Sequence, residues 1–297
     1  MPSVKRKGAG MIYNLGSINA DHFYGLSHLP KPGETIAAES LSTGLGGKGA
    51  NMSVACARAG RQVRHIGAVG KNGTWATDRL AGYGVDIDAV RVVDAATGHA
   101  IINIDAAGEN AIVIHPGANQ MQSENHIREV LKDAGPDDVL LLQNETNLGA
   151  FCAELGSVIG MTVIYAAAPF EACITQKILP LTDILILNET ELAQLLDSEN
   201  AGVCDLGVKR IIVTRGANGA ILYENAEQKR FAAPVVSAVD TTGAGDTFTG
   251  YLAAGIDAGL SMDHSIQRAM RAAALMVTKK GTADAIPVLQ EVKDFFG

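Results

Sequence analysis

Short apolar runs alternate with amphipathic segments along most of the chain. Residues 139–142 and 184–187, for example, are entirely apolar and have the length of a buried strand, far short of a membrane span. Between such runs, apolar residues recur at the spacing of a helix that packs one face on a sheet. The pattern predicts strands at residues 12–16, 63–69, 139–143, 162–165, 183–187 and 210–214, and helices at 123–133, 148–159 and 189–196.

This alternation indicates βαβ units, in which successive parallel strands are joined by helices that cover both faces of one sheet. Neither an internal repeat nor a low-complexity linker interrupts the pattern. We therefore expect residues 11–297 to form a single domain of the α/β class, with three layers, α/β/α, around a mostly parallel sheet.

Two regions do not fit a crossover helix. Residues 23–44 are rich in Gly, Pro, Ser and Thr, and residues 99–105 and 110–115 have the pattern of two short strands around the turn 106–109. A small β excursion over the C-terminal edge of the sheet would use both regions and would act as a lid that excludes water. We expect this lid in segments of about 17–46 and 98–115.

Composition and charge narrow the function classes. The net charge of −8 argues against binding to nucleic acid or to a membrane surface, because both require a basic patch. The four cysteines are scattered without metal-ligand spacing, as expected of free thiols in a reducing compartment. No apolar segment of a secretory signal follows residues 1–10, so we predict a flexible tail there and a cytoplasmic protein.

The sequence DTTGAGD at residues 240–246 lies between an apolar segment, 235–240, predicted as a strand, and a helix that carries Phe248, Leu252 and Ile256 on one face. Two glycines at a strand-to-helix turn let the backbone approach a ligand closely. The free N–H groups of the first helical turn then favour an anion. Asp246 is at once an ordinary N-terminal carboxylate and a candidate general base.

Two glycine-containing segments near the N-terminus are candidates for ligand binding. Residues 16–21 (GSINAD) place Asn19 and Asp21 after the first strand, where ligands bind in open α/β sheets, although an Asx-turn or a helix cap is an alternative. Residues 44–51 (GLGGKGAN) contain GxGxxG but lack the flanking strand and acidic residue of a dinucleotide site, and Gly49 after Lys48 excludes a P-loop. We interpret them as a turn that brings Asn51 against a small polar ligand before a helix at 52–59.

Two later segments are candidates for nucleotide binding. Residues 188–191 (NETE) follow a predicted strand, and their carboxylates could hold Mg²⁺ through water or simply complement the helix dipole. Residues 214–219 (TRGANG) end another strand in a hairpin-like turn, and their own pattern does not specify a ligand.

Together these segments resemble the ribokinase family of carbohydrate kinases, also called the PfkB family. The resemblance covers about residues 12–288, with GGKGAN at 46–51 similar to the N-terminal signature and DTTGAGDTF at 240–248 similar to the C-terminal one. It implies a ribokinase-like fold with a small β lid. It also implies ATP-dependent phosphorylation of a sugar hydroxyl, with Asp246 as general base and backbone N–H groups of Gly243, Ala244 and Gly245 as the anion hole.

The remaining roles also follow from the resemblance. Mg²⁺ would be held through water by Glu191, and an activating monovalent cation, expected to be K⁺, by Asp240, Thr242, Lys279 and Gly281. A homodimer formed through the lids is implied as well. The sugar-binding positions are Asn19, Asp21, Gly47, Lys48, Asn51, Glu145 and Asp246, and the nucleotide-binding positions are Asn188, Thr214, Gly216, Gly219 and Gly245.

Some positions depart from the family pattern or narrow the substrate. Residues 166–169 read AAAP where an Asn-Pro-Ala-Pro-like stretch is common, and Met270 stands where a polar contact to adenine is usual. Residues 16–21 and 33–35 are more similar to the members that phosphorylate ribose than to fructokinases or nucleoside kinases. We therefore expect D-ribose as the substrate and ribose 5-phosphate as the product. The alternatives are another sugar, a nucleoside, or a non-catalytic sugar-binding regulator, for which loss of Asp246 would be expected.

Overall fold

The computed structural model describes residues 10–297, and the expected N-terminal tail at 1–10 lies almost wholly outside them. Its main feature is a nine-stranded sheet in the order β13-β12-β11-β10-β9-β8-β1-β4-β5, parallel except for the hairpin strands β12 and β13 at one edge. The strands are β1 (Ile12–Leu15), β4 (Val63–Gly70), β5 (Val90–Val93), β8 (Val139–Leu142), β9 (Thr162–Ala166), β10 (Ile184–Asn188), β11 (Arg210–Thr214), β12 (Ala220–Glu224) and β13 (Glu227–Phe231).

Helices cover both faces of this sheet, so alternate residues of a strand enter different cores. In β8, Val139 and Leu141 belong to one core, and Leu140 and Leu142 belong to the other. The first core is closed by α1 (Lys48–Arg58), α2 (Thr74–Gly82), α7 (Ala244–Asp257), α8 (Met262–Met276) and α9 (Leu289–Phe296). The second is closed by α3 (Glu124–Leu131), α4 (Gly149–Ile159), α5 (Ala172–Ile178) and α6 (Glu189–Glu199).

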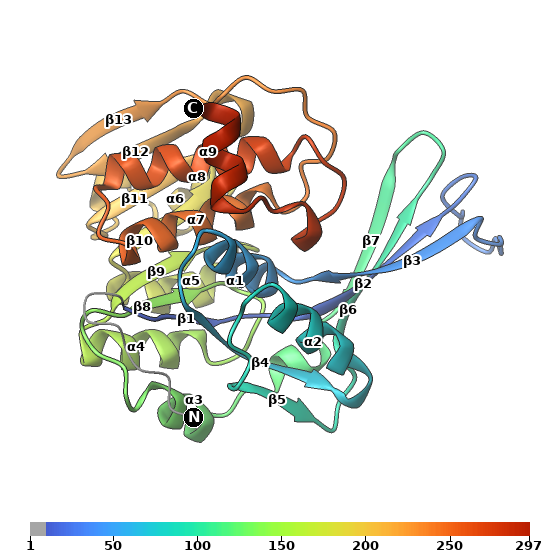
Figure 1. Ribbon diagram of the computed structural model, residues 1–297, viewed down its shortest axis with the longest axis horizontal. Coiled ribbons are helices and arrows are strands. Elements are labelled where there is room, and N and C mark those ends of the chain that lie inside the picture. Colours follow the sequence, from blue (N-terminus) through green and yellow to red (C-terminus); the bar gives the residue numbers. More distant parts are fainter. Residues whose placement is uncertain (1–9) are drawn as a thin grey trace.

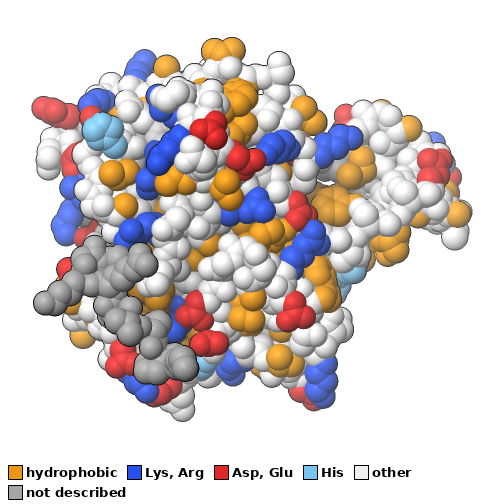
Figure 2. All heavy atoms as spheres, in the orientation of Figure 1, with side chains coloured by type: hydrophobic (Ala, Val, Ile, Leu, Met, Phe, Trp, Pro, Cys, Tyr) orange, Lys and Arg blue, Asp and Glu red, His pale blue; other side chains and the backbone are white. Residues whose placement is uncertain are grey.

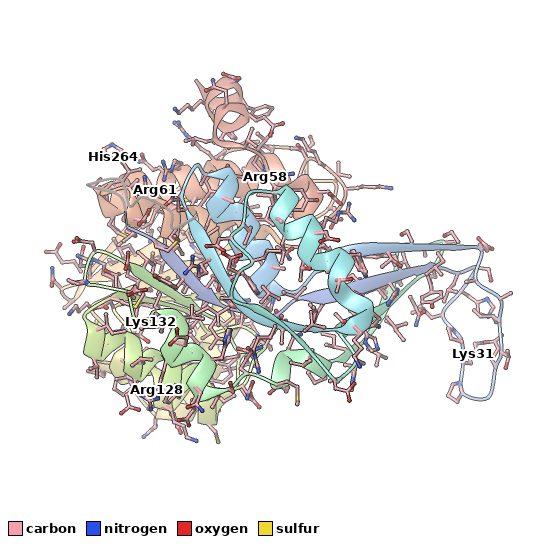
Figure 3. All side chains as sticks on the ribbon, turned by 60° about the horizontal axis from the view of Figure 1, so that its bottom comes forward. Lys31, Arg58, Arg61, Arg128, Lys132 and His264 are labelled. Atoms are coloured by element: carbon pink, nitrogen blue, oxygen red, sulfur yellow. The ribbon has the colours of Figure 1, made fainter. Side chains whose placement is uncertain are left out.

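A second sheet has four strands in the order β3-β2-β6-β7. The strands are β2 (Asn19–Gly25), β3 (Ser40–Gly46), β6 (Gly98–Ile104) and β7 (Asn110–His115), which project together away from the main body (Figure 1). Lys31, in the loop between β2 and β3, lies far from that body (Figure 3). We call this second sheet the lid sheet.

The fold class expected from the sequence is confirmed: three layers, a mostly parallel sheet and a smaller separate sheet. Two local predictions are wrong. Residues 235–240 form no strand, because Val235 is fully exposed and the N–H groups of Val239 and Asp240 donate to Val277 O at the end of α8. Helix α1 begins at Lys48 rather than at residue 52, since Gly47, with φ of 93°, ends the extended chain there.

Charged side chains of both signs are mixed over the visible face of the main body, without a single-sign patch (Figure 2). Within residues 10–297, no helix has the length and hydropathy needed to cross a membrane.

Candidate active site

The carboxyl end of β1 and the start of α1 meet in a contact that only glycine allows. A Cβ atom on Gly49 would lie 2.4 Å from the Gly16 Cα and 2.4 Å from the Ser17 N. The Ala50 N–H donates to Ser17 O at 2.8 Å, which fixes the two segments against each other. The two glycine-containing segments near the N-terminus therefore form one wall of a single site.

A carboxylate at the start of α7 faces this wall. Asn51 Nδ2 donates to Asp246 Oδ2 at 2.8 Å, and both side chains are buried, with exposed fractions of 4% and 7%. The buried Oδ1 of Asn51 has no partner among the described residues, so it is available to a ligand hydroxyl. The structure thus joins residues 51 and 246, which the sequence separates widely.

The N-terminus of α7 supplies hydrogen-bond donors beside that carboxylate. Gly243 precedes the helix with φ of 79°, a conformation that a residue with a side chain adopts only under strain. The Ala244 N–H donates to Thr241 O at 3.2 Å, whereas the N–H groups of Gly243 and Gly245 have no acceptor among residues 10–297. Free N–H groups at the positive end of a helix dipole form an anion site.

Two more carboxylates come from the lid sheet and from the end of β8. Asp21 in β2 is buried, and its side chain lies against Gly46 of β3, where any Cβ would collide with the Asp21 carboxylate at 1.9 Å. Glu145 follows β8, and its Oε2 accepts hydrogen bonds from Ser17 Oγ and, at 3.0 Å, from the Lys48 backbone N–H. Ser17 was not predicted as a site residue, because its only signal in the sequence is its place after the first strand.

Electrostatics links these groups. Burial raises the pKa of Asp21 to about 7, and the negative charges of Glu145 and Asp246 add to the shift. The negative charge of Asp246 likewise raises the pKa of Lys48, although burial opposes it. Three carboxylates and one ammonium group are therefore close enough to influence one another, a set of charges that suits a ligand with several hydroxyl groups.

A cavity of about 230 Å³ lies beside Lys48 and Asp246 and is bounded on another side by β10. Asn188 begins α6 with a capping box: its side chain accepts the Glu191 N–H, and Glu191 Oε2 accepts the Asn188 N–H, both at 2.8 Å. Burial raises the pKa of Glu191. The cavity is lined by Lys48, Met52, Ala166, Ala168, Ile186, Leu187, Asn188, Glu191, Thr214, Gly243, Gly245, Asp246 and Thr249.

A larger cavity of about 350 Å³ shares Thr214 and Gly245 with the first and is mostly apolar. Gly216 and Gly219 line it from the β11–β12 turn, and Met270 lines it from α8. Phe248, which the sequence suggested only as an apolar helix residue, lines it as well, together with Ala233 and Val277, which the sequence did not single out. A polar cavity that opens into an apolar one fits a phosphate chain followed by a flat base.

Asp240 ties two loops together near the start of α7. Its carboxylate accepts the Thr242 N–H at 2.9 Å and the Gly281 N–H at 3.1 Å. Burial alone would raise the pKa of Asp240, but these hydrogen bonds outweigh it and lower the pKa. The Lys279 side chain is directed to Glu291, so only its backbone remains for a ligand here. Within the described part of the chain, no three His, Cys, Asp or Glu residues cluster closely enough to hold a metal ion by themselves.

A parallel α/β sheet with a helix N-terminus, a buried carboxylate and paired polar and apolar cavities defines a small-molecule phosphotransferase. The comparisons with known proteins give the particular family. Residues 11–289 match the model of the pfkB family carbohydrate kinases, so the chain belongs to this family. The protein is thus a carbohydrate kinase with the ribokinase fold.

Individual relatives agree with this assignment. A ribokinase of Haemophilus influenzae is 34% identical over 95% of this chain and 96% of its own length. A deoxyribokinase of Salmonella typhi is 30% identical over 95% of this chain and 97% of its own length. The structure of Arabidopsis thaliana ribokinase complexed with ribose and ATP superimposes with a TM-score of 0.86 and 32% identity, covering 97% of this chain and 98% of that one.

Proposed function

We propose that this carbohydrate kinase transfers the γ-phosphoryl group of ATP to the 5-hydroxyl of D-ribose, giving ribose 5-phosphate and ADP. The observation that carries the proposal is the position of Asp246. Its carboxylate is bonded to Asn51 on the polar wall and lines the cavity that opens into the apolar one. A hydroxyl group and a phosphate chain would meet at this residue.

In the proposed reaction, Asp246 accepts the proton of the 5-hydroxyl while the hydroxyl oxygen forms its bond to the γ-phosphorus. The bond between the γ-phosphorus and the β,γ-bridging oxygen breaks, and ADP leaves with that electron pair. The free N–H groups of Gly243 and Gly245 stabilise the negative charge of the transferring group, and the Ala244 N–H joins them when it gives up its hydrogen bond to Thr241 O. Lys48 adds a positive charge on the same cavity.

The proposed ribose contacts are Asn19, Asp21, Gly47, Lys48, Asn51 and Glu145. Support for ribose comes from the ribokinases among the relatives and from the carboxylates and amides on this side of the site, which match a polyhydroxy ligand. The adenine would lie in the apolar cavity against Met270, and Asn188, Thr214, Gly216 and Gly219 would contact the rest of the nucleotide.

Two cations belong to the proposal. Mg²⁺ bound to the ATP phosphates would neutralise charge on the transferring group, and Glu191 would hold it through water. A single carboxylate on the cavity fits this role, because Mg²⁺ keeps several waters and takes the rest of its ligands from phosphates. K⁺ would bind where Asp240 joins its two loops, with Thr242, Lys279 and Gly281 contributing through the backbone.

We also propose that two copies associate through their lid sheets. Leu41, Ile101 and Val113 come from three strands of the lid sheet and are exposed by 60%, 37% and 64%. Several exposed apolar side chains on one small sheet are typical of a surface that a partner covers. For the compartment, we propose the cytoplasm, since all four cysteines are free thiols, two of them exposed.

A second candidate substrate is 2-deoxyribose, which the 30% identity to a deoxyribokinase favours. The test is a coupled ADP-release assay with ATP, Mg²⁺ and K⁺ and a panel of ribose, 2-deoxyribose, fructose and nucleosides. We expect the highest kcat/KM with ribose. A higher kcat/KM with another acceptor would overturn the ribose assignment, and sugar binding by calorimetry without ADP release would identify a non-catalytic binding protein.

A further inference from the structure

Asn119 is a buried amide at the base of the lid sheet. It lies in the 3₁₀ turn Gly117–Gln120, where the chain returns from β7 to the main body, and its exposed fraction is 2%. Its two side-chain atoms reach the other connection to the lid, between β1 and β2: Asn119 Oδ1 accepts the Ile18 N–H at 2.9 Å, and Asn119 Nδ2 donates to Asn19 Oδ1 at 2.7 Å. The residue therefore joins both connections.

These two bonds determine which atom of Asn19 faces the ligand. The Ile18 backbone N–H can only donate, so it requires the oxygen of Asn119, and the nitrogen of Asn119 must then point to Asn19. The nitrogen of Asn119 in turn requires the oxygen of Asn19. The Asn19 Nδ2 is left without an acceptor among residues 10–297. A fixed backbone donor thus sets the side-chain amide of Asn19 with its N–H groups free.

The neighbouring strand leaves room for this arrangement. Gly98 pairs with Asn19 across β2 and β6. A Cβ at position 98 would lie 2.2 Å from Asn119 Nδ2 and 2.5 Å from Asn19 Oδ1, so any larger residue would push the two amides apart. The bond between the two amides depends on this glycine.

A donor at Asn19 complements its surroundings. Asp21 lies against Gly46, which pairs with Asn19, while Glu145 is bonded to Ser17 and Asp246 to Asn51. Ionised carboxylates only accept hydrogen bonds. Sugar hydroxyls that donate to these carboxylates keep their oxygen lone pairs free, and an amide N–H satisfies such a lone pair. An Asn19 turned the other way would add a further acceptor to a site already rich in them.

We propose that Asn119 is a positioning residue for sugar binding, which holds the Asn19 amide so that its N–H donors face the sugar. This inference rests on the proposed function, in which Asn19 contacts the sugar. Asn119 itself touches no reacting atom and acts through Asn19.

The test compares Asn119→Asp and Asn119→Ala at pH 8. The aspartate keeps an oxygen for the Ile18 N–H but sets a second oxygen against Asn19 Oδ1, so the Asn19 amide turns over. The alanine leaves Asn19 free to keep its original orientation. We expect Asn119→Asp to raise the KM for ribose by about 10- to 100-fold and Asn119→Ala by less, with the KM for ATP unchanged in both.

If Asn119 only stabilised the fold, Asn119→Ala would have the larger effect of the two variants, because the isosteric aspartate leaves no cavity. The matched control is Asn72→Asp, the same change at another amide near the lid base, where Oδ1 accepts a hydrogen bond from Thr97 Oγ1 at 2.8 Å and, in the described part of the chain, no hydrogen bond to Asn19 is present. We expect it to leave the KM for ribose unchanged. A wild-type KM for ribose in Asn119→Asp, or equal increases for ribose and ATP, would overturn the inference.

Two further variants keep the test decisive if Asn119→Asp does not fold. Asn19→Ala should raise the KM for ribose, and adding Asn119→Ala to it should cause no further increase. A full additional effect in the double variant would refute the coupling of the two residues. If Asn19→Ala itself leaves the KM for ribose unchanged, the proposed sugar contact fails instead, so the two failures are distinguishable.

Discussion

Asp21 is one of three carboxyl groups on the polar side of the site, and its protonation changes near neutral pH. Its pKa is raised to about 7 by burial and by the charges of Glu145 and Asp246, so it is only half ionised at neutral pH. The ionised form accepts hydrogen bonds from sugar hydroxyls, and the protonated form does not accept them equally well. Sugar binding at this residue is therefore coupled to pH.

The first prediction concerns the KM for ribose. Below pH 7 the KM should rise as Asp21 becomes protonated, by up to about tenfold per pH unit, while the KM for ATP changes little. Asp21→Asn is the control, because its KM should be higher but independent of pH between about 5 and 8. Steady-state kinetics across this range measure it, and an unchanged pH dependence in Asp21→Asn would contradict the assignment.

The same pKa gives a prediction for stability without sugar. Because the pKa of Asp21 is higher in the folded chain than its ordinary value of 3.8, folding takes up a proton, and stability falls as pH rises from about 4 to 7. Asp21→Asn removes this effect. The variant should be more stable than the wild type at pH 8, by a few kcal/mol, and the difference should shrink towards pH 4. Urea unfolding at the two pH values tests this, and an equal difference at both would refute it.

At the scale of elements, the site depends on how closely α1 approaches the end of β1. Gly49→Ala should lower the free energy of unfolding by about 1–3 kcal/mol and raise the KM for ribose, because the new Cβ would overlap the backbone of residues 16 and 17. Gly82→Ala in α2 is the matched control, since no heavy atom lies within 4 Å of its added Cβ. The control should be neutral or stabilising. Equal effects of the two changes, measured by urea unfolding, would contradict the role of this contact.

Strands and helices with a clear pattern of apolar residues could be predicted from the sequence, whereas the contacts between them could not. The six apolar runs at 12–16, 63–69, 139–143, 162–165, 183–187 and 210–214 became central strands because each fills two cores. Segment 235–240 has a similar apolar pattern but lies along the end of α8, and only its tertiary hydrogen bonds to Val277 distinguish it from a strand.

The site likewise has parts that could be predicted from the sequence and parts that could not. The segments at 46–51 and 240–248 identify the family by their pattern alone. Ser17 and Asn119 could not be found in this way, because each acts through a partner that is distant in the sequence: Glu145 for Ser17, and Ile18 and Asn19 for Asn119. The apolar cavity likewise combines residues of four separate segments, and Phe248 and Val277 have no local signal that distinguishes them from core residues.

At the scale of the whole molecule, we proposed that two copies associate through their lid sheets. Val113→Asp places a charge in the exposed apolar surface of the lid sheet, so the variant should be a monomer where the wild type is a dimer. Val158→Asp in α4, at a position exposed by 80% on the main body, is the matched control and should leave the dimer intact. Light scattering measures both, and a wild-type monomer would contradict the proposal.

The two sides of the site meet at Asp246, where the polar wall that includes Asn51 contacts the N-terminus of α7. The measurement that tests the proposed role of Asp246 most directly is the turnover of Asp246→Asn with ribose and ATP, alongside ribose binding by calorimetry. We predict that kcat falls by about 10²–10⁴, because the general base is lost, while the affinity for ribose stays close to that of the wild type. A variant that binds ribose and turns over at nearly the wild-type rate would show that Asp246 does not accept the proton.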